Sequence, residues 1–321
     1  MKISILVPIY GVERFIASCA DSLFSQSYED IEYIFVNDCT PDGSIKLLNS
    51  VLSCYPHRQP QVKLLHHDHN RGLGAARLTA IEAATGDYVM HVDSDDLLPS
   101  DAVAQLAARA RETQCDIVDG GYAQMCHDDI LRAEMPYEGS KRGFLKLMLC
   151  QNIVLSMIWG RLYRRTLYTE NRIYPVAGID NGEDLAIVPR LYFHATRATV
   201  PAVVYYYRDD NAASYTNAAI SDKAIRSYLK ANAEVFRFYQ SHDVQRVYAY
   251  ALELGFVNVL RDMRRHGVSV GLVDELCPLP LHHPATRFMA MLMRIRCPLA
   301  VASLLYRCQR KVFELSVRLF S

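Results

Sequence analysis

Over its first 120 residues the sequence alternates between two hydrophobic periods, and this alternation restricts the folds open to the chain. Continuous apolar runs such as ISILVPI at 3–9 and IEYIFVND at 31–38 are typical of buried strands. Between them, ERFIASCADSLFSQ at 13–26 has apolar residues at helical spacing. Fully apolar strands separated by helices predict an α/β fold with a mostly parallel sheet that helices cover on both faces.

The same alternation continues to about residue 121 and then stops. We expect further strands at 62–67, 88–93 and 116–121, with helices at 44–55, 74–86 and 100–114. The polar stretch at 125–143 predicts a loop or linker. Mixed helix and strand follow to about residue 216, and from about residue 220 the pattern is helical to the end.

Composition excludes several classes of protein. The 35 basic and 35 acidic residues balance, which gives no indication of a nucleic-acid partner. Nine scattered cysteines without a C-x-x-C pair indicate a reduced cytoplasmic chain rather than a disulfide framework or a zinc site. The histidines at 66, 67 and 69 are expected to face solvent and bind no metal. Neither a signal peptide nor a transmembrane span is expected.

Polar residues collect where the predicted strands end. In parallel α/β sheets, ligands bind beyond the carboxyl ends of the strands, so these residues are expected to line one crevice. They are Pro8, Tyr10 and Glu13 after the first strand, Asn37 and Asp38 after the second, and Asp93, Asp95 and Asp96 after the fourth.

The stretch HVDSDD places three carboxylates within four positions. One interpretation is a solvated turn in which Asp95 or Asp96 caps the next helix. The other is a metal site, because Asp93 and Asp95 share a face in extended backbone and their hard oxygens suit Mg²⁺ or Mn²⁺. Their position at a strand end favours the metal.

The stretch NRGLGAAR at 70–77 places two glycines and two arginines at a predicted helix start. Gly72 and Gly74 would let the backbone approach a ligand, and Arg71 or Arg77 could meet a phosphate. A simple turn followed by an exposed helix explains the same residues. Asp38 has two interpretations as well: an Asx-turn, or an acceptor for a base N–H or a ribose hydroxyl.

Later in the chain four further residues are candidates. Glu183 and Asp184 precede an apolar run, where they could stabilise the first helical turn or supply a general base. Arg208 could contact a diphosphate. Trp159, the single tryptophan, could pack in the core or offer a platform for a sugar.

Taken in order, these stretches resemble the family-2 glycosyltransferases with the GT-A fold, of the bacterial surface-polysaccharide type. SILVPIYGVERFI resembles the strand and turn that wrap the nucleotide base, and VNDCTPDGS the acidic turn, with Asn37 in place of its first Asp and Cys39 in place of the following Gly. NRGLGAAR, HVDSDD and GEDLAI resemble the N-x-G-x-x-x-A-R, metal-binding D-x-D and E-D elements. The resemblance is strong over residues 1–100 and extends to about residue 216.

The resemblance implies a GT-A (Rossmann-like), mostly parallel sheet with helices on both faces and a helical C-terminal extension. Residues 1–120 would be the half that binds the nucleotide sugar. Residues 121–216 would bind the acceptor and carry the catalytic base, and residues 217–321 would be helical, with a potential to associate with a membrane.

The resemblance also implies roles for individual residues. Asp184 is the expected base, with Glu183 beside it, and Asp95 together with Asp93 is expected to hold Mn²⁺ or Mg²⁺. Trp159 is a weaker candidate for contact with the acceptor. The expected donor-binding residues are Pro8, Tyr10, Glu13, Asn37, Asp38, Arg71, Arg77, Asp93, Ser94 and Arg208.

The implied activity is metal-dependent, inverting transfer of a hexose or N-acetylhexosamine from a UDP-sugar to a hydroxyl of a glycan or lipid-linked saccharide. Two alternatives remain. A nucleotidyltransferase that makes nucleotide sugars would release pyrophosphate from UTP, although no glycine-rich loop bearing Arg or Lys follows the first strand. A non-catalytic binder would hold the nucleotide sugar without transferring it.

The C-terminal 36 residues have a local charge excess. Residues 286–321 contain seven basic residues and one acid, Glu314, so seven minus one leaves a formal charge of +6. One interpretation is a helix packed on the protein with a solvated basic face. The other is peripheral contact with the anionic inner face of the cell membrane.

Overall fold

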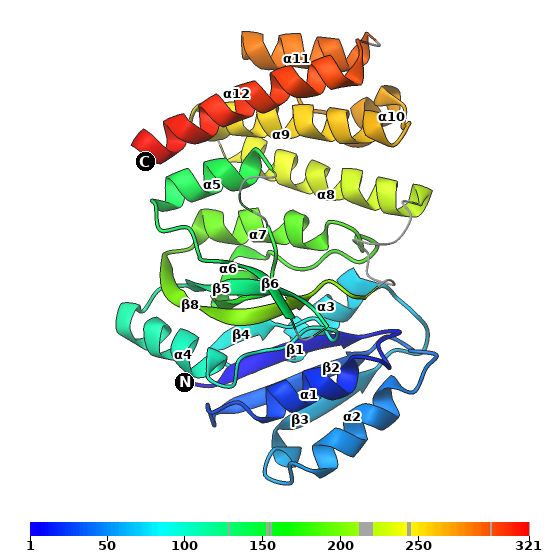
Figure 1. The fold of residues 1–321 in the computed structure, drawn as a ribbon, viewed down its shortest axis with the longest axis vertical. Coiled ribbons are helices and arrows are strands. Elements are labelled where there is room, and N and C mark those ends of the chain that lie inside the picture. Colours follow the sequence, from blue (N-terminus) through cyan, green and yellow to red (C-terminus); the bar gives the residue numbers. More distant parts are fainter. Residues whose placement is uncertain are drawn as a thin grey trace. The chain divides into compact units, whose positions relative to one another are not determined.

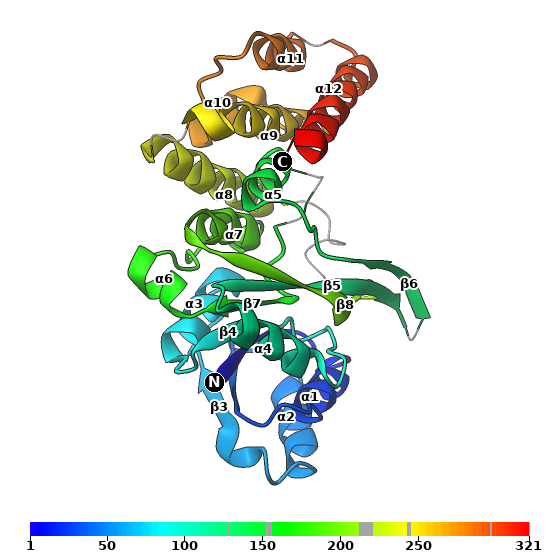
Figure 2. The same cartoon turned by 90° about the vertical axis from the view of Figure 1, so that its left-hand side faces the viewer.

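The structure is a computed structural model, and it describes residues 1–127, 129–151, 154, 156–211, 221–242, 245–295 and 297–320. The chain forms two compact units that interleave along the sequence. The first comprises residues 1–138, 157–180 and 194–219, and the second comprises residues 139–156, 181–193 and 220–321. Figures 1 and 2 show the elements from two directions.

The described residues of the first unit form one eight-stranded sheet. Its strands are β1 (Ile3–Ile9), β2 (Ile31–Asn37), β3 (Val62–His66), β4 (Tyr88–His91), β5 (Ile117–Cys126), β6 (Asp129–Glu134), β7 (Arg161–Arg164) and β8 (Arg197–Arg208). The order is β3-β2-β1-β4-β7-β5-β6, and β8 pairs with β5. Strands β3, β2, β1 and β4 pair in parallel, and so do β5 and β8. Strand β7 pairs antiparallel with β4 and with β5, and β6 pairs antiparallel with β5. The predicted mostly parallel α/β sheet is thus confirmed.

Helices cover both faces of this sheet, which explains why its central strands are apolar throughout. Alternate residues of β1 and β2, such as Ile5 and Phe35, join a buried cluster with apolar residues of the first and fourth helices, including Leu23 and Leu106. The third helix packs against β1 and β2. These helices are α1 (Ile16–Phe24), α2 (Ser44–Ser53), α3 (Leu73–Ala83), α4 (Ala102–Thr113) and α6 (Thr166–Asn171), with a 3₁₀ turn, η1, at Gln59–Gln61.

The second unit is helical over its described residues. Its helices are α5 (Lys141–Leu149), α7 (Glu183–His194), α8 (Asp222–Ser241), α9 (Gln245–Arg265), α10 (Val270–Leu276), α11 (Pro284–Arg294) and α12 (Leu299–Phe320). Helix α9 contacts α5, α8, α10, α11 and α12 and is therefore the centre of the unit. This confirms the predicted C-terminal helices. The predicted functional halves stay a proposal, and the boundary at 216/217 lies outside the described residues. Among the described helices, none has the length and hydrophobicity needed to cross a membrane.

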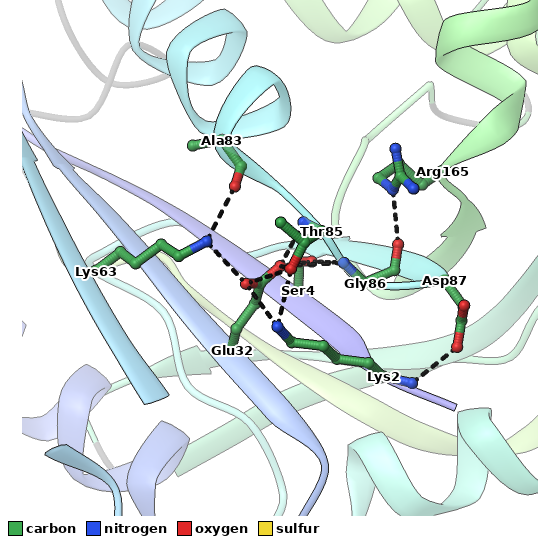
Figure 3. A network of polar contacts seen from close by, with 9 residues as sticks. All are labelled: Lys2, Ser4, Glu32, Lys63, Ala83, Thr85, Gly86, Asp87 and Arg165. Carbon is green, nitrogen blue, oxygen red and sulfur yellow. Dashed lines mark hydrogen bonds and ion pairs between the residues drawn. The ribbon is translucent and has the colours of Figure 1, made fainter. Parts of the chain in front are cut away.

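A buried carboxylate ties together the amino ends of the parallel strands. Glu32 is the second residue of β2, and its side chain is 4% exposed. Its oxygens accept hydrogen bonds from Ser4 Oγ, from Thr85 N–H and from Gly86 N–H, and they form ion pairs with Lys2 and Lys63 (Figure 3). Burial alone would raise the pKa of Glu32, but the bonds from Ser4, Thr85 and Lys2 outweigh it and hold the pKa well below its usual range.

Glu32→Gln is expected to lower the free energy of unfolding at pH 7 by about 1–3 kcal/mol, because an amide cannot satisfy the donors that surround this position. The folded-state pKa lies below the unfolded value of about 4.3. The stabilisation is therefore present above about pH 4.3 and is lost as the pH falls toward the folded-state pKa. Urea unfolding of both proteins at pH 7 and at pH 4 should show that the difference in their free energy of unfolding is smaller at pH 4. A matched change at the exposed Glu82 should have no such effect.

Candidate functional site

The carboxyl ends of β2, β1 and β4 lie side by side in the sheet, so the predicted strand-end residues come from adjacent strands. Two contacts near these strand ends join residues that are far apart in the sequence. Asp38, after β2, contacts the loop that leads into α3, and Arg77 of α3 reaches Asp93, after β4.

Asp38 is 3% exposed, and its carboxylate organises the loop before α3. Oδ1 accepts a hydrogen bond from the N–H of Arg71 at 2.8 Å and lies 2.6 Å from Nδ1 of His67, and Oδ2 accepts from the N–H of Gly72 at 2.8 Å. These three bonds fill most of the roughly four acceptor positions of a carboxylate. Asp38 thus has an evident structural role, and its contact with the nucleotide base stays a prediction.

The expectation that all three histidines face solvent is wrong for His67. Its side chain is 4% exposed and lies between Asp38 and Thr79, with Nε2 2.9 Å from Thr79 Oγ1. The imidazole therefore connects the end of β2 to the middle of α3. The sequence around His67 has no periodic pattern that could have identified this role, and the nearby His69 is exposed.

The turn after β2 is built from residues expected to border the base. Asn37 accepts a hydrogen bond from the N–H of Thr40 at 2.8 Å, and Glu13 accepts one from the N–H of Gly43 at 2.9 Å. These two side chains thereby fix the backbone of the turn at Thr40 and Gly43. Pro8 is buried within β1, whereas Tyr10 is 50% exposed and Glu13 is exposed as well, so these two residues are accessible to a ligand.

Arg77 brings a positive charge to the end of β4. Its side chain is 1% exposed, and Nη2 lies 2.8 Å from Oδ1 of Asp93, whose side chain is 27% exposed. The side chain of Arg71, by contrast, is exposed. Arg77 thus fixes one oxygen of Asp93 from within the protein and leaves the carboxylate accessible on its other side.

Asp95 and Asp96 differ in their surroundings. Asp96 is 1% exposed and accepts hydrogen bonds from the Tyr205 hydroxyl and from the backbone N–H of Arg208, both at 2.7 Å. Asp95 is half-buried and accepts one from Asn211 Nδ2 at 2.7 Å. Burial raises the pKa of both carboxyls, and the negative charge of neighbouring aspartates, with Asp93 acting on each, raises it further. Asp96 therefore anchors the segment to β8, and Asp93 and Asp95 are left as an incompletely compensated pair.

These two carboxylates fit a divalent cation. Within the described residues there is no group of three or more His, Cys, Asp and Glu side chains that could hold a metal alone. Mg²⁺ and Mn²⁺ commonly bind through one or two carboxylates, with waters and substrate phosphates completing the shell. Asp95, with Asp93, would hold such an ion, which would also relieve their mutual repulsion.

Strand β8 and the residues just after it supply side chains that the sequence did not identify as part of the site. Leu97 and Tyr206 exchange backbone hydrogen bonds of 3.1 and 2.9 Å, which holds β8 against the acidic segment. Tyr205 and Asn211 thereby reach Asp96 and Asp95. Ser94 is buried, and its donor contact stays a prediction.

Arg208 lies at the end of the same strand. Its guanidinium lies over the ring of Phe15 at 5.7 Å, with Nη2 3.5 Å from Ser18 Oγ. It also lowers the pKa of Asp95, although less than burial and Asp93 raise it. The cation is thus near the predicted metal ligands, which is where a diphosphate contact requires it.

Trp159 packs within the first unit. It is 6% exposed, stacks on Tyr205 with ring centroids 4.4 Å apart and meets the edge of Tyr122 at 5.1 Å. Little of the indole surface is left for a sugar. The structure favours the packing interpretation, and the acceptor contact of Trp159 stays a weak prediction.

The glycines of NRGLGAAR allow close contact with protein backbone and side chains. A Cβ at Gly74 would lie 2.5 Å from the carbonyl oxygen of Val176, and one at Gly72 would lie 2.3 Å from Oδ1 of Asp180. Gly72 also has φ +89°, which favours glycine. The predicted close approach exists, but its partner is the segment 176–180 of the same unit.

Asp180 caps helix α3 from a distant part of the chain. The N-cap residue, Gly72, has no side chain, and Oδ1 of the buried Asp180 accepts a hydrogen bond from the N–H of Gly74 at 3.3 Å. Asp38 and Asp180 therefore hold consecutive parts of the loop and helix start between Arg71 and Gly74.

Asp180→Ala is expected to lower the free energy of unfolding by about 0.5–2 kcal/mol, the usual cost of losing an N-cap acceptor. Asp180→Asn keeps an acceptor oxygen and should recover most of this loss. Urea unfolding of the three proteins measures the difference. Equal stability of the alanine variant and the wild type would contradict the capping role.

Glu183 and Asp184 form the first turn of α7 in the second unit. Glu183 is buried and Asp184 is half-buried. Acidic side chains in the first turn interact favourably with the positive end of the helix dipole. The preceding turn is fixed, since the N–H of Asn181 donates to Ser227 Oγ at 2.9 Å and Gly182 has φ +85°. The stabilising interpretation holds for both acids, and it does not conflict with a catalytic role for Asp184.

A family model described as Glycosyl transferase family 2 matches residues 4–171. Among curated relatives, the uncharacterized glycosyltransferase EpsJ of Bacillus subtilis is 32% identical over 217 residues, which are 65% of this chain and 61% of the relative. TarS of Staphylococcus aureus, a poly(ribitol-phosphate) beta-N-acetylglucosaminyltransferase, is 25% identical over 68% of this chain and 37% of its own length. The alignments thus span about three fifths or less of these relatives.

Solved structures share the fold. TarS residues 1–349 in complex with UDP-GlcNAc match with a TM-score of 0.58 and 19% identity, over 99% of this chain and 92% of that one. The mannosyltransferase PcManGT from Pyrobaculum calidifontis, in complex with GDP-Man and Mn²⁺, matches with a TM-score of 0.50 and 16% identity, over 98% and 87%. Both likenesses agree with the GT-A fold expected from the sequence.

Proposed function

Because the chain belongs to glycosyltransferase family 2, we propose that it transfers a sugar from a UDP-sugar to an acceptor hydroxyl with inversion at the anomeric carbon. The observation that carries this proposal is the Asp93–Asp95 pair at the carboxyl end of β4. Arg77 and Asn211 fix the two carboxylates, and their charge is incompletely compensated. Such a pair suits a divalent metal shared with a nucleoside diphosphate.

The choice of UDP and of a divalent metal has support from the structural relatives. TarS forms complexes with UDP and with UDP-GlcNAc, and PcManGT binds GDP-Man with Mn²⁺. When bound, Mn²⁺ or Mg²⁺ would act as a Lewis acid that stabilises the charge on the leaving diphosphate. Asp95 and Asp93 would hold this ion, Arg208 would add positive charge beside it, and Tyr10 with the turn at 37–43 would border the base.

Asp184 is the proposed general base. It would accept the proton of the acceptor hydroxyl while that oxygen attacks the anomeric carbon from the face opposite the diphosphate. Glu183, buried beside it in the first turn of α7, would keep the base in position. Inversion agrees with the name of TarS as a β-transferase, because the sugar of UDP-GlcNAc is α-linked.

The proposed acceptor is a saccharide or lipid-linked saccharide of a cell-envelope polysaccharide, in line with the poly(ribitol-phosphate) named for TarS. We place the enzyme in the cytoplasm, at the inner face of the cell membrane, with peripheral contact through residues 286–321. The transferred sugar would be a hexose or an N-acetylhexosamine.

A donor screen tests this function. UDP-, GDP- and dTDP-sugars are incubated with Mn²⁺, Mg²⁺ or EDTA, and the released nucleotide is measured. We expect UDP release from at least one UDP-sugar with metal and none with EDTA. Pyrophosphate release from UTP would indicate a nucleotidyltransferase instead, and UDP binding without release from any donor would indicate a binder.

A further inference from the structure

Helix α12 has two separate apolar faces. One of them carries Ala302, Tyr306, Phe313 and Val317, all at most 8% exposed. This face packs on α5, α9 and α11 within the second unit, and Figure 1 shows α12 in red among these helices. It accounts for the position of the helix in the fold.

The second apolar face has no cover from the described residues of its unit. Its large side chains are between 41% and 76% exposed. Their spacing of three, four or seven residues places them along one line of an α-helix, about 130° away from the buried face at 100° per residue. The residues are Val301, Leu304, Leu305, Val312, Leu315 and Leu319. Six exposed side chains in one continuous stripe form a patch typical of an interaction surface.

Basic side chains border this stripe on one side. Arg307, Lys311 and Arg318 are exposed and lie along the adjacent line of the helix. Glu314 pairs with Lys311 at 3.1 Å and with Arg318 at 3.0 Å, and it is the single acid of α12. With Arg310 the helix has four basic residues against one acid, and four minus one leaves +3.

Helix α11 repeats this combination on a smaller scale. Phe288 and Met291 within the helix and Ile295 just past its end are between 44% and 59% exposed, at i, i+3 and i+7. Arg287 and Arg294 join Met291 and Ile295 in the lining of an open depression of about 400 Å³. Exposed apolar side chains next to arginines therefore occur on two consecutive helices of the unit.

We propose that α12 lies flat on an anionic lipid surface, with its exposed stripe in the acyl boundary and Arg307, Lys311 and Arg318 at the phosphate groups. The charge selects this occupant, since two copies of a +3 helix repel one another whereas an anionic membrane attracts each of them. The inference deepens the proposed membrane contact. Its test measures lipid binding, so its outcome does not depend on whether the protein transfers sugar.

The test is co-sedimentation of the full chain with vesicles of phosphatidylcholine, either pure or mixed equally with phosphatidylglycerol. Leu304→Glu/Val312→Glu introduces charge into the stripe at exposed positions, where we expect the fold to be unaffected. The matched control, Ala108→Glu/Thr169→Glu, makes the same change of charge at exposed positions of α4 and α6. A third variant, Arg307→Gln/Arg318→Gln, keeps the stripe and reduces the basic edge.

We expect the wild type and the control to bind the mixed vesicles, and the stripe variant to bind about tenfold or more weakly. The basic-edge variant should lose affinity for mixed vesicles, and added salt should weaken binding of the wild type. Equal binding of wild type and stripe variant would overturn the proposal. So would a wild type that stays in solution and forms a dimer that the stripe variant abolishes.

Discussion

Asp184→Asn is expected to bind UDP and the donor as the wild type does and to transfer sugar about 10²–10⁴-fold more slowly, the usual contribution of a general base. Asparagine has nearly the same shape as aspartate, so the first turn of α7 should keep its position. Its amide cannot accept the proton of the acceptor hydroxyl. The loss should therefore appear in kcat, with the donor Kd unchanged.

Turnover of this variant is best followed by UDP release under saturating donor and acceptor, with donor affinity measured separately by calorimetry. Asp222→Asn is the matched control, because this residue of the second unit is exposed and lies in the first turn of another helix, α8. It should retain full activity. Transfer by Asp184→Asn at the wild-type rate would show that the base is another residue.

Asp95→Ala is expected to abolish metal-dependent binding of UDP, with an affinity loss on the order of 100-fold. The Asp95 side chain is half-buried and accepts a hydrogen bond from Asn211, so its loss should disturb the fold little. Asp96→Ala should differ, because it removes a buried acceptor from Tyr205 and the Arg208 N–H group and should lower the free energy of unfolding by about 1–3 kcal/mol.

Calorimetric titration with UDP, in Mn²⁺ and in EDTA, separates these two aspartates. The wild type should bind more tightly with the metal, and Asp95→Ala should bind equally weakly in both. The exposed Asp101, at the start of α4, offers a control in which alanine leaves metal dependence intact. Unchanged, metal-dependent binding by Asp95→Ala would remove this residue from the metal site.

Strands β1, β2 and β4 were predictable because nearly all of their residues are buried. Helices α1 and α2 were predictable because each has a clear apolar face. Strand β6 was not predictable, since all its residues are exposed and its sequence, DILRAE, does not alternate between apolar and polar residues. It exists because its backbone pairs with β5, as Gln124 with Arg132 and Cys126 with Asp129. Main-chain pairing of this kind has no hydrophobic signature.

The residues of the acidic segment could be found from the sequence because a chemical pattern, D-x-D after a strand, marks them. The residues that hold this segment and the start of α3 in place could not be found in this way. Tyr205, Asn211 and Asp180 act through hydrogen bonds to residues more than 100 positions away. His67 likewise depends on which helix faces the end of β2. Such contacts follow from tertiary packing, which local spacing does not encode.

The configuration of the product is the most direct test of the proposed mechanism. The UDP-sugar that releases UDP in the screen is incubated with acceptor and metal, and the anomeric proton coupling of the first product is followed by NMR. Direct displacement assisted by Asp184 predicts that an α-linked donor gives a β-linked product. An α-linked first product would contradict inversion and, with it, the role assigned to Asp184.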